Sequence, residues 1–164
     1  MKRLILIRHA KSSWKDMTLS DFDRPLNKRG ILNGDFMSDK LSKKIKSVDA
    51  LFSSSSKRTM LTSNFFINKI NVDKDRIYYI DNLYHATENY LIDFVSSLKN
   101  SFSSIICLGH NPGFTDVSNY FLGNTFYNLP TCGIVIIDFK LEKWKDVGKK
   151  SGKLTYKMFP KDYS

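Results

Sequence analysis

The sequence predicts a three-layer α/β/α fold with a mostly parallel central sheet and an antiparallel edge strand. Two observations support this prediction. Short apolar runs alternate with longer segments of helical periodicity, and only a Lys- and Gly-rich turn separates the last two apolar runs. Such alternation indicates βαβ units with parallel strands, whereas a direct loop favours an antiparallel pair. The 164 residues suffice for one core and are too few for two ordinary domains, so we expect residues 1–164 to form a single domain.

Six apolar runs have the length of buried strands. The first ends at a charged residue, and the fifth is the strongest β signal in the chain. The sixth is weaker and follows the Lys- and Gly-rich turn. We expect strands at 4–7, 48–52, 77–80, 105–108, 133–139 and 154–159.

Four segments between these runs have the start signals or apolar spacing of helices. Asn27 can cap a helix that continues to about Lys44, and Thr87 can cap another with an i, i+3, i+4, i+7 apolar stripe. Two more helices are expected from Arg58 to about residue 70 and from Gly113 toward residue 121. The apolar positions of the first three helices are Leu32, Phe36 and Leu41, then Leu61, Phe65 and Phe66, then Leu91, Phe94, Val95 and Leu98.

The composition is that of a globular protein, with 41% hydrophobic and 26% charged residues. No apolar run reaches the roughly 18 residues of a membrane helix, and the first apolar run is too short for a signal peptide. We therefore expect a cytoplasmic protein with no membrane partner. Cys107 and Cys132 lie in apolar stretches without metal-ligand spacing, so we expect two reduced, buried thiols.

The formal net charge of +10 indicates an anionic partner, which could be phosphate, an acidic protein surface or nucleic acid. Much of the excess is lysine on helix faces and near the C-terminus, where charge runs are usually solvated. The chain has no basic motif interleaved with aromatic residues of the RNA-binding type. We expect no nucleic-acid partner, and a salt-dependent shift with DNA or RNA would contradict this expectation.

Polar, anion-binding residues follow three of the predicted strands. The first strand ends at Arg8 and His9, the second is followed by Ser54 and then Arg58, and the fourth ends in a Gly-His-Asn-Pro-Gly run that contains His110. Ligands of a parallel α/β sheet bind beyond the carboxyl ends of its strands, so these side chains should meet at one edge. Arginine forks and helix N-termini suit phosphate oxygens, and the sequence therefore predicts a site for a dianionic phosphate.

Each of these signals has an ordinary structural alternative. An Arg-His pair at a strand end is weak evidence alone, the Gly-His-Asn-Pro-Gly run could be only a turn, and Arg58 could be a surface helix residue. Their joint placement after successive strands is what favours a functional site.

The sequence resembles the histidine phosphatase superfamily, whose members share the phosphoglycerate mutase-like fold. Within it, the chain is most similar to the SixA-type phosphohistidine phosphatases, small members that lack the usual inserted lid. The matching segments are Arg8-His9-Ala10-Lys11-Ser12-Ser13-Trp14, Asp23-Arg24-Pro25-Leu26 with Arg29-Gly30, Ser54 with Arg58 and Thr62, Leu83-Tyr84, Gly109-His110-Asn111-Pro112-Gly113 and Leu129-Pro130-Thr131-Cys132-Gly133.

The resemblance implies a role for each matched position. His9 would attack phosphorus and carry the phosphoryl group, and water would then hydrolyse this intermediate. Arg8, Arg58 and His110 would hold the phosphoryl oxygens. Further substrate contacts are expected from Arg24, Ser54 and Asn111. The resemblance implies no metal and no organic cofactor.

His85 marks a departure from the wider superfamily. Many members place a glutamate or aspartate general acid where this chain has His85, and Glu88 fits the first turn of the next helix instead. His85 could contact the substrate or could be only a polar residue at a loop–helix junction. Without a strong acid, a substrate with a good leaving group is favoured, and phosphohistidine has a labile P–N bond.

The favoured hypothesis is thus a monomeric phosphohistidine phosphatase that acts on a phosphorylated protein histidine, with a phosphate ion as a further ligand of the site. A small-molecule phosphomonoesterase of the same superfamily is the first alternative. The second is a catalytically weak module that binds phosphoproteins.

Overall fold

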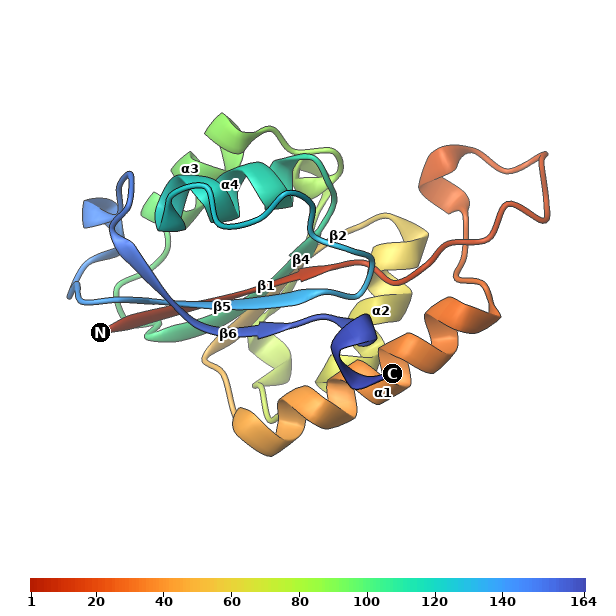
Figure 1. Cartoon of the computed structure of the whole chain (residues 1–164), viewed down its shortest axis with the longest axis horizontal. Helices are drawn as coiled ribbons and strands as arrows, with labels where there is room; N and C mark the ends of the chain where they lie inside the picture. The colour runs from red at the N-terminus through yellow and green to blue at the C-terminus, as the bar shows by residue number, and fades with distance from the viewer.

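A six-stranded mixed sheet forms the centre of the molecule in the computed structural model, which describes residues 1–164 (Figure 1). The strands are β1 (Lys2–Arg8), β2 (Ala50–Ser54), β3 (Ile77–Ile80), β4 (Ser104–Gly109), β5 (Ile134–Phe139) and β6 (Gly152–Met158). Their order across the sheet is β3-β2-β4-β1-β5-β6. β3, β2, β4 and β1 pair in parallel, and β5 is antiparallel to both β1 and β6. All six predicted strands are present, and the antiparallel pairing of the last two is confirmed.

Helices cover both faces of the sheet, so the predicted three-layer architecture is confirmed (Figure 1). They are α1 (Lys28–Lys44), α2 (Lys57–Ile67), α3 (Glu88–Ser96) and α4 (Gly113–Leu122). α1 packs against α2 on one face, and α3 packs against α4 on the other. Short 3-10 helices occur in the connections, and the first of them spans Asp21–Asp23.

Alternation along the central strand explains why the core has two halves. Successive side chains of a strand point to opposite faces. Leu4 and Leu6 of β1 therefore join the buried cluster under α3 and α4, while Ile5 and Ile7 join the cluster under α1 and α2. All four are at most 1% exposed, as expected for a strand covered on both faces.

The predicted helix starts are confirmed by side-chain caps. The Asn27 side chain accepts a hydrogen bond from the Gly30 amide at 2.8 Å, and the Thr87 hydroxyl accepts one from the Tyr90 amide at 3.2 Å. Each bond satisfies a backbone donor that has no partner within the first turn of its helix.

The buried face of α1 differs from the one its apolar residues suggest. Leu41 is buried, but Leu32 is 70% and Phe36 40% exposed. The helix approaches α2 through Gly34 instead, where a Cβ would lie 2.5 Å from the Phe65 ring. Close packing through a glycine thus decides which side of the helix faces the core.

Two further observations concern the whole chain. Cys107 and Cys132 are free and buried, as predicted. No helix of the structure has both the length and the apolar character needed to cross a membrane.

The parallel strands bring the predicted functional segments to one edge of the sheet. Arg8 pairs with Gly109 across β1 and β4, so the next residues of the two strands, His9 and His110, emerge side by side. β2 extends to Ser54, two residues beyond the predicted end of this strand, because its last residues pair with β3. The loop 9–27 between β1 and α1 projects beyond the same edge (Figure 1).

Candidate active site

A pocket of about 260 Å³ lies at the carboxyl edge of the parallel strands. It brings together seven of the eight site residues predicted from the sequence, which are Arg8, His9, Arg24, Arg58, His85, His110 and Asn111. The other lining residues are Lys11, Ser12, Trp14, Asp21 and Thr131. The eighth predicted residue, Ser54, is fully buried outside the pocket lining.

His9 presents its ring nitrogen Nε2 to this pocket, where it accepts a 3.4 Å hydrogen bond from Arg58 Nε. It follows β1 directly, and its side chain is held by a 2.8 Å hydrogen bond between Nδ1 and the Ala10 carbonyl oxygen. A carbonyl oxygen only accepts, so Nδ1 carries the proton and Nε2 keeps its lone pair. Burial lowers the pKa of His9 to about 3, against the effect of the Ala10 hydrogen bond and with help from the neighbouring arginines. At neutral pH, the His9 ring is therefore uncharged, and an uncharged imidazole nitrogen has the lone pair that a nucleophile needs.

Arg58 donates the hydrogen bond that His9 Nε2 accepts. It lies in the first turn of α2, its side chain is 3% exposed, and its Nε is 3.4 Å from His9 Nε2. The far side of the guanidinium binds Asp21, through Nη1 to the backbone oxygen at 2.6 Å and Nη2 to Oδ2 at 3.0 Å. Arg58 thus connects His9 to an acidic residue on the loop 9–27.

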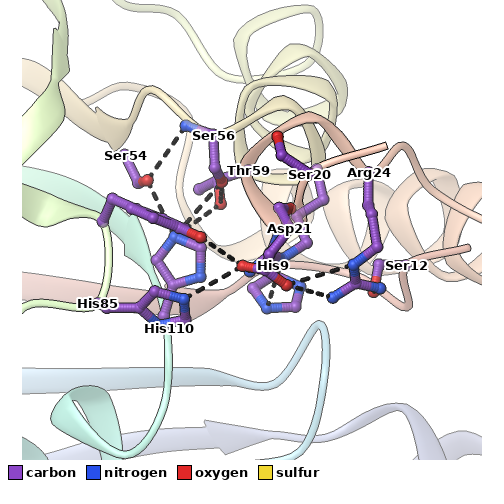
Figure 2. Close-up of polar contacts among 12 residues, drawn as sticks. His9, Ser12, Ser20, Asp21, Arg24, Ser54, Ser56, Thr59, His85 and His110 are labelled. Carbon is purple, nitrogen blue, oxygen red and sulfur yellow. Dashed lines mark hydrogen bonds and ion pairs between the residues drawn. The ribbon is translucent and has the colours of Figure 1, made fainter. Parts of the chain in front are cut away.

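His110 lies beside His9, with the two ring centroids 5.1 Å apart. Its Nε2 is 2.9 Å from Ser54 Oγ and 3.3 Å from Thr59 Oγ1 (Figure 2). Its Nδ1 is buried without a hydrogen-bond partner in the protein. Burial lowers the pKa of His110, and the charges of neighbouring groups contribute to the same shift. Ser54 is therefore placed to orient His110, and not to touch a ligand of the pocket directly.

Arg8 and Asn111 both hold the segment that precedes β5. Arg8 Nη1 donates to the Leu129 carbonyl at 2.9 Å, and Asn111 Nδ2 donates to the same oxygen at 2.8 Å. Asn111 Oδ1 accepts from the Thr115 amide and hydroxyl, so its amide group is already fully used within the protein. Arg8 Nε, in contrast, is buried without a partner. Arg8 therefore lines the pocket with one buried donor unpaired, and Asn111 shapes the pocket wall.

Asp21 is one of the five lining residues to which the sequence analysis assigned no role, and it makes the most contacts with the predicted ones. Its Oδ1 accepts from Arg24 Nε at 3.2 Å and Nη2 at 2.8 Å, while its Oδ2 accepts from Arg58, from the Tyr84 hydroxyl and from His85 Nε2 at 3.2 Å. Figure 2 shows the carboxylate beside His9, between His85 and Arg24. Burial raises the pKa of Asp21, but these hydrogen bonds outweigh it and hold the pKa below its usual range. The available signal was an acid three residues before an arginine already assigned to the pocket.

Arg24 enters the pocket as predicted and is fixed from three sides. Besides Asp21, it donates from Nη1 to Ser12 Oγ at 2.7 Å, and its guanidinium stacks on Trp14 at 3.6 Å from the ring centroid. Trp14 itself is 64% exposed at the rim. Stacking on one face and hydrogen bonding in the plane suit a guanidinium that remains available to an anion.

The two candidates for a general acid occupy different places. His85 lies at the pocket with a positive φ of 50°, and its half-exposed ring contacts Tyr84 at a centroid distance of 4.2 Å. Glu88 lies in the first turn of α3 and lines a separate pocket. The structure therefore places His85, and not Glu88, in the pocket that contains His9.

The pocket has the chemistry of an oxyanion site. Three arginines and Lys11 face a single carboxylate, and a neutral imidazole nitrogen lies among them. Planar guanidinium donors suit phosphoryl oxygens, and a free nitrogen lone pair can attack phosphorus. The structure contains no group of three or more His, Cys, Asp or Glu side chains arranged to hold a metal ion.

The fold and the first half of the sequence match a known family of proteins. Residues 4–77, which include His9 and Arg58, match the model of the histidine phosphatase superfamily, branch 1. The resemblance read from the sequence is thus confirmed, and the phosphoglycerate mutase-like fold is confirmed with it. The family match and the fold together support phosphatase activity.

Individual relatives extend the similarity over nearly the whole chain. A protein of Agrobacterium tumefaciens with the provisional name phosphohistidine phosphatase SixA superposes with a TM-score of 0.80 at 22% identity, covering 97% of this chain and 99% of that one. The protein histidine phosphatase SixA complexed with tungstate gives 0.82 at 16% identity, with 99% of both chains covered. An uncharacterized chloroplastic protein of Arabidopsis thaliana is 28% identical over 159 residues, which is 92% of this chain and 72% of the plant protein.

Proposed function

We propose that this protein is a phosphohistidine phosphatase that removes the phosphoryl group from a phosphorylated histidine of a protein. The observation that carries the proposal is the neutral His9 ring, which is fixed through Nδ1 and presents Nε2 to a pocket of arginines. Support also comes from the similar SixA structures, one of which was solved with tungstate, a tetrahedral oxyanion like phosphate.

The reaction proceeds in two steps on His9. In the first, Nε2 attacks phosphorus and takes the phosphoryl group from the substrate. Arg58 lies next to Nε2, and Arg8 and His110 line the same pocket, so these side chains stabilise the phosphoryl oxygens as charge develops. In the second, water attacks the phosphoryl group on His9, which releases inorganic phosphate and restores the neutral ring.

A protein substrate suits the shape of the site. The pocket is small, about 260 Å³, and Trp14 and His85 at its rim are exposed. A phosphoryl group and one ring fill such a space, so the rest of the substrate remains outside, where a protein surface has room.

The decisive experiment is to trap the phosphoryl group on the enzyme. Labelled phosphoramidate, a labile phosphoryl donor, should transfer phosphate to His9, and mass spectrometry should locate it on that ring. His9→Ala should remove both labelling and turnover without changing the thermal unfolding curve. Asp23→Asn is a matched control in the neighbouring loop, because Asp23 is exposed and accepts a side-chain hydrogen bond only from Ser20.

A turnover-competent His9→Ala protein would overturn the mechanism. A substrate panel tests the alternatives. Rapid hydrolysis of sugar phosphates without phosphohistidine hydrolysis would instead identify a small-molecule phosphomonoesterase. Binding of phosphoprotein with no turnover of any donor would identify a binding module.

A further inference from the structure

The pocket contains one feature that a site for phosphate alone does not need. Asp21 is the only carboxylate among the residues that line it. A carboxylate in contact with a dianionic phosphoryl group would repel it and weaken binding. Arg58 connects this carboxylate to the nucleophile, since its Nε is 3.4 Å from His9 Nε2 and its Nη2 is 3.0 Å from Asp21 Oδ2. Asp21 is therefore close enough to meet the part of the substrate attached to phosphorus.

The part of the pocket beside Asp21 and Tyr84 already contains an imidazole ring, that of His85. His85 Nε2 lies 3.2 Å from Asp21 Oδ2, and its ring packs against Tyr84 with centroids 4.2 Å apart. The Tyr84 hydroxyl donates to the same carboxylate oxygen. One acceptor in the ring plane and one aromatic face are the two contacts that a protonated imidazole needs.

His85 is held beside Asp21 by one side-chain hydrogen bond and by ring contacts with Tyr84 and His110, whose centroids lie 4.2 and 5.2 Å away. Its side chain is 53% exposed, and Asp21 is its one side-chain hydrogen-bond partner. A second imidazole could replace it there, because one N–H donor would be exchanged for another and the carboxylate would keep all its bonds.

We propose that Asp21 and Tyr84 form the subsite for the leaving imidazole of phosphohistidine, and that His85 occupies this subsite in the present structure. The inference rests on the proposed function and names the chemical group that the same site selects. When the substrate binds, the His85 ring moves out and the phosphorylated ring takes its place.

The transfer step then balances without a separate acid. The bound substrate ring carries a proton on the nitrogen distant from phosphorus, and this N–H donates to Asp21. The substrate P–N bond breaks and its electron pair stays on the ring nitrogen, while the His9 Nε2 lone pair forms the new P–N bond. The substrate leaves as neutral imidazole with its distant proton in place. His9 becomes the phosphorylated cationic ring, with its own proton held on Nδ1 by the Ala10 carbonyl.

This arrangement also discriminates against phosphate esters. An alkoxide leaving group needs a proton from the enzyme, whereas Asp21 accepts hydrogen bonds from Arg24, Arg58, Tyr84 and His85 and remains ionised. A carboxylate stabilises a ring that carries positive charge and offers nothing comparable to a neutral ester oxygen. Asp21 is thus a specificity-determining residue.

The test compares two phosphoryl donors across variants. For N-phosphoimidazole, Asp21→Asn should lower kcat/KM at least about tenfold more than it does for p-nitrophenyl phosphate, because a hydrogen bond to a charged group is lost only with the first donor. Any disturbance of the arginines lowers both values alike, so their ratio isolates the subsite. Asp23→Asn, in the same 3-10 turn, should leave the ratio unchanged. His85→Ala should raise kcat/KM for N-phosphoimidazole at least about twofold, because it removes the internal competitor.

Equal losses for both donors in Asp21→Asn would overturn the subsite, as would a selective loss of N-phosphoimidazole turnover in His85→Ala. Imidazole itself separates this inference from the proposed function, since its binding needs no turnover. NMR titration should detect imidazole binding to His85→Ala and its loss in the Asp21→Asn, His85→Ala double variant. Absence of binding to His85→Ala refutes the subsite even in an active phosphatase. Imidazole binding without any phosphohistidine hydrolysis supports the subsite and refutes the proposed function.

Discussion

Replacing Asp21 with Asn should lower the free energy of unfolding by about 2–3 kcal/mol. The substitution keeps the shape of the side chain and removes the charge that two guanidinium groups share. The side chains of Arg58 and Arg24 are only 3% and 8% exposed, and Asp21 contacts both through hydrogen-bonded ion pairs of 3.0 and 2.8 Å. Removing one partner of a buried pair costs about 3–5 kcal/mol. The Asp21 side chain is 41% exposed, so water screens part of this loss and the lower figure follows.

The assay is thermal unfolding with and without inorganic phosphate. For a chain of this length each kcal/mol corresponds to about 2–4 °C, so Asp21→Asn should unfold about 4–12 °C below the wild type. Phosphate should raise Tm more in the variant than in the wild type, because an anion then replaces the missing carboxylate between the arginines.

A surface ion pair gives the matched control. Asp35 pairs with Lys69 at 2.7 Å, but their side chains are 70% and 27% exposed. Asp35→Asn should therefore change stability by less than about 1 kcal/mol and leave the effect of phosphate at its wild-type size. If Asp21→Asn unfolds at the temperature of Asp35→Asn, or if phosphate stabilises the two variants equally, then Asp21 does not stabilise the fold through a buried ion pair with the two arginines.

Three further outcomes are expected. The imidazole nitrogens of His9 and His110 should remain uncharged from pH 8 to pH 5 in ¹⁵N NMR, because burial lowers both pKa values. In the unfolded state these histidines take up protons near pH 6.5. The free energy of unfolding should therefore be highest above that pH and should fall as the pH drops toward the folded pKa, which is about 3 for His9. Titration of either ring near pH 6.5 in the folded protein would contradict this expectation. Gly30→Ala should lower the free energy of unfolding in urea by about 1–3 kcal/mol, because the added methyl group would lie 2.1 Å from a backbone carbonyl oxygen of the loop after β1. Wild-type stability of this variant would show that the loop moves aside without cost. Trp14→Ala should weaken inhibition by phosphate about two- to fivefold, since the ring stacks on Arg24; an unchanged inhibition constant would exclude this contribution.

Local patterns in the sequence were sufficient to predict the helices and strands. The apolar runs, the caps Asn27 and Thr87 and the alternation of strands with helices act over a few residues, and the structure contains the corresponding elements. The burial of α1 was harder to predict, because it depends on the approach of α2 to Gly34.

The convergence of His9 and His110 also followed from the sequence. Parallel strands end at a common edge, and both histidines directly follow such strands. The hydrogen-bond partners of the other predicted site residues could not be predicted from strand order. Ser54 faces His110, and Asn111 is occupied with Leu129 and Thr115, because these bonds depend on how β2, α4 and the segment before β5 pack together.

The sequence by itself determined the layered α/β fold, the strand-end positions of Arg8, His9 and His110, and the likeness to the histidine phosphatase superfamily. Only the tertiary structure revealed that Asp21 lies between Arg24 and Arg58 and binds Tyr84 and His85 from another loop. Propensity and periodicity act between near neighbours in the chain. A carboxylate shared by residues up to 64 positions apart exists only after the sheet has brought three loops to one edge.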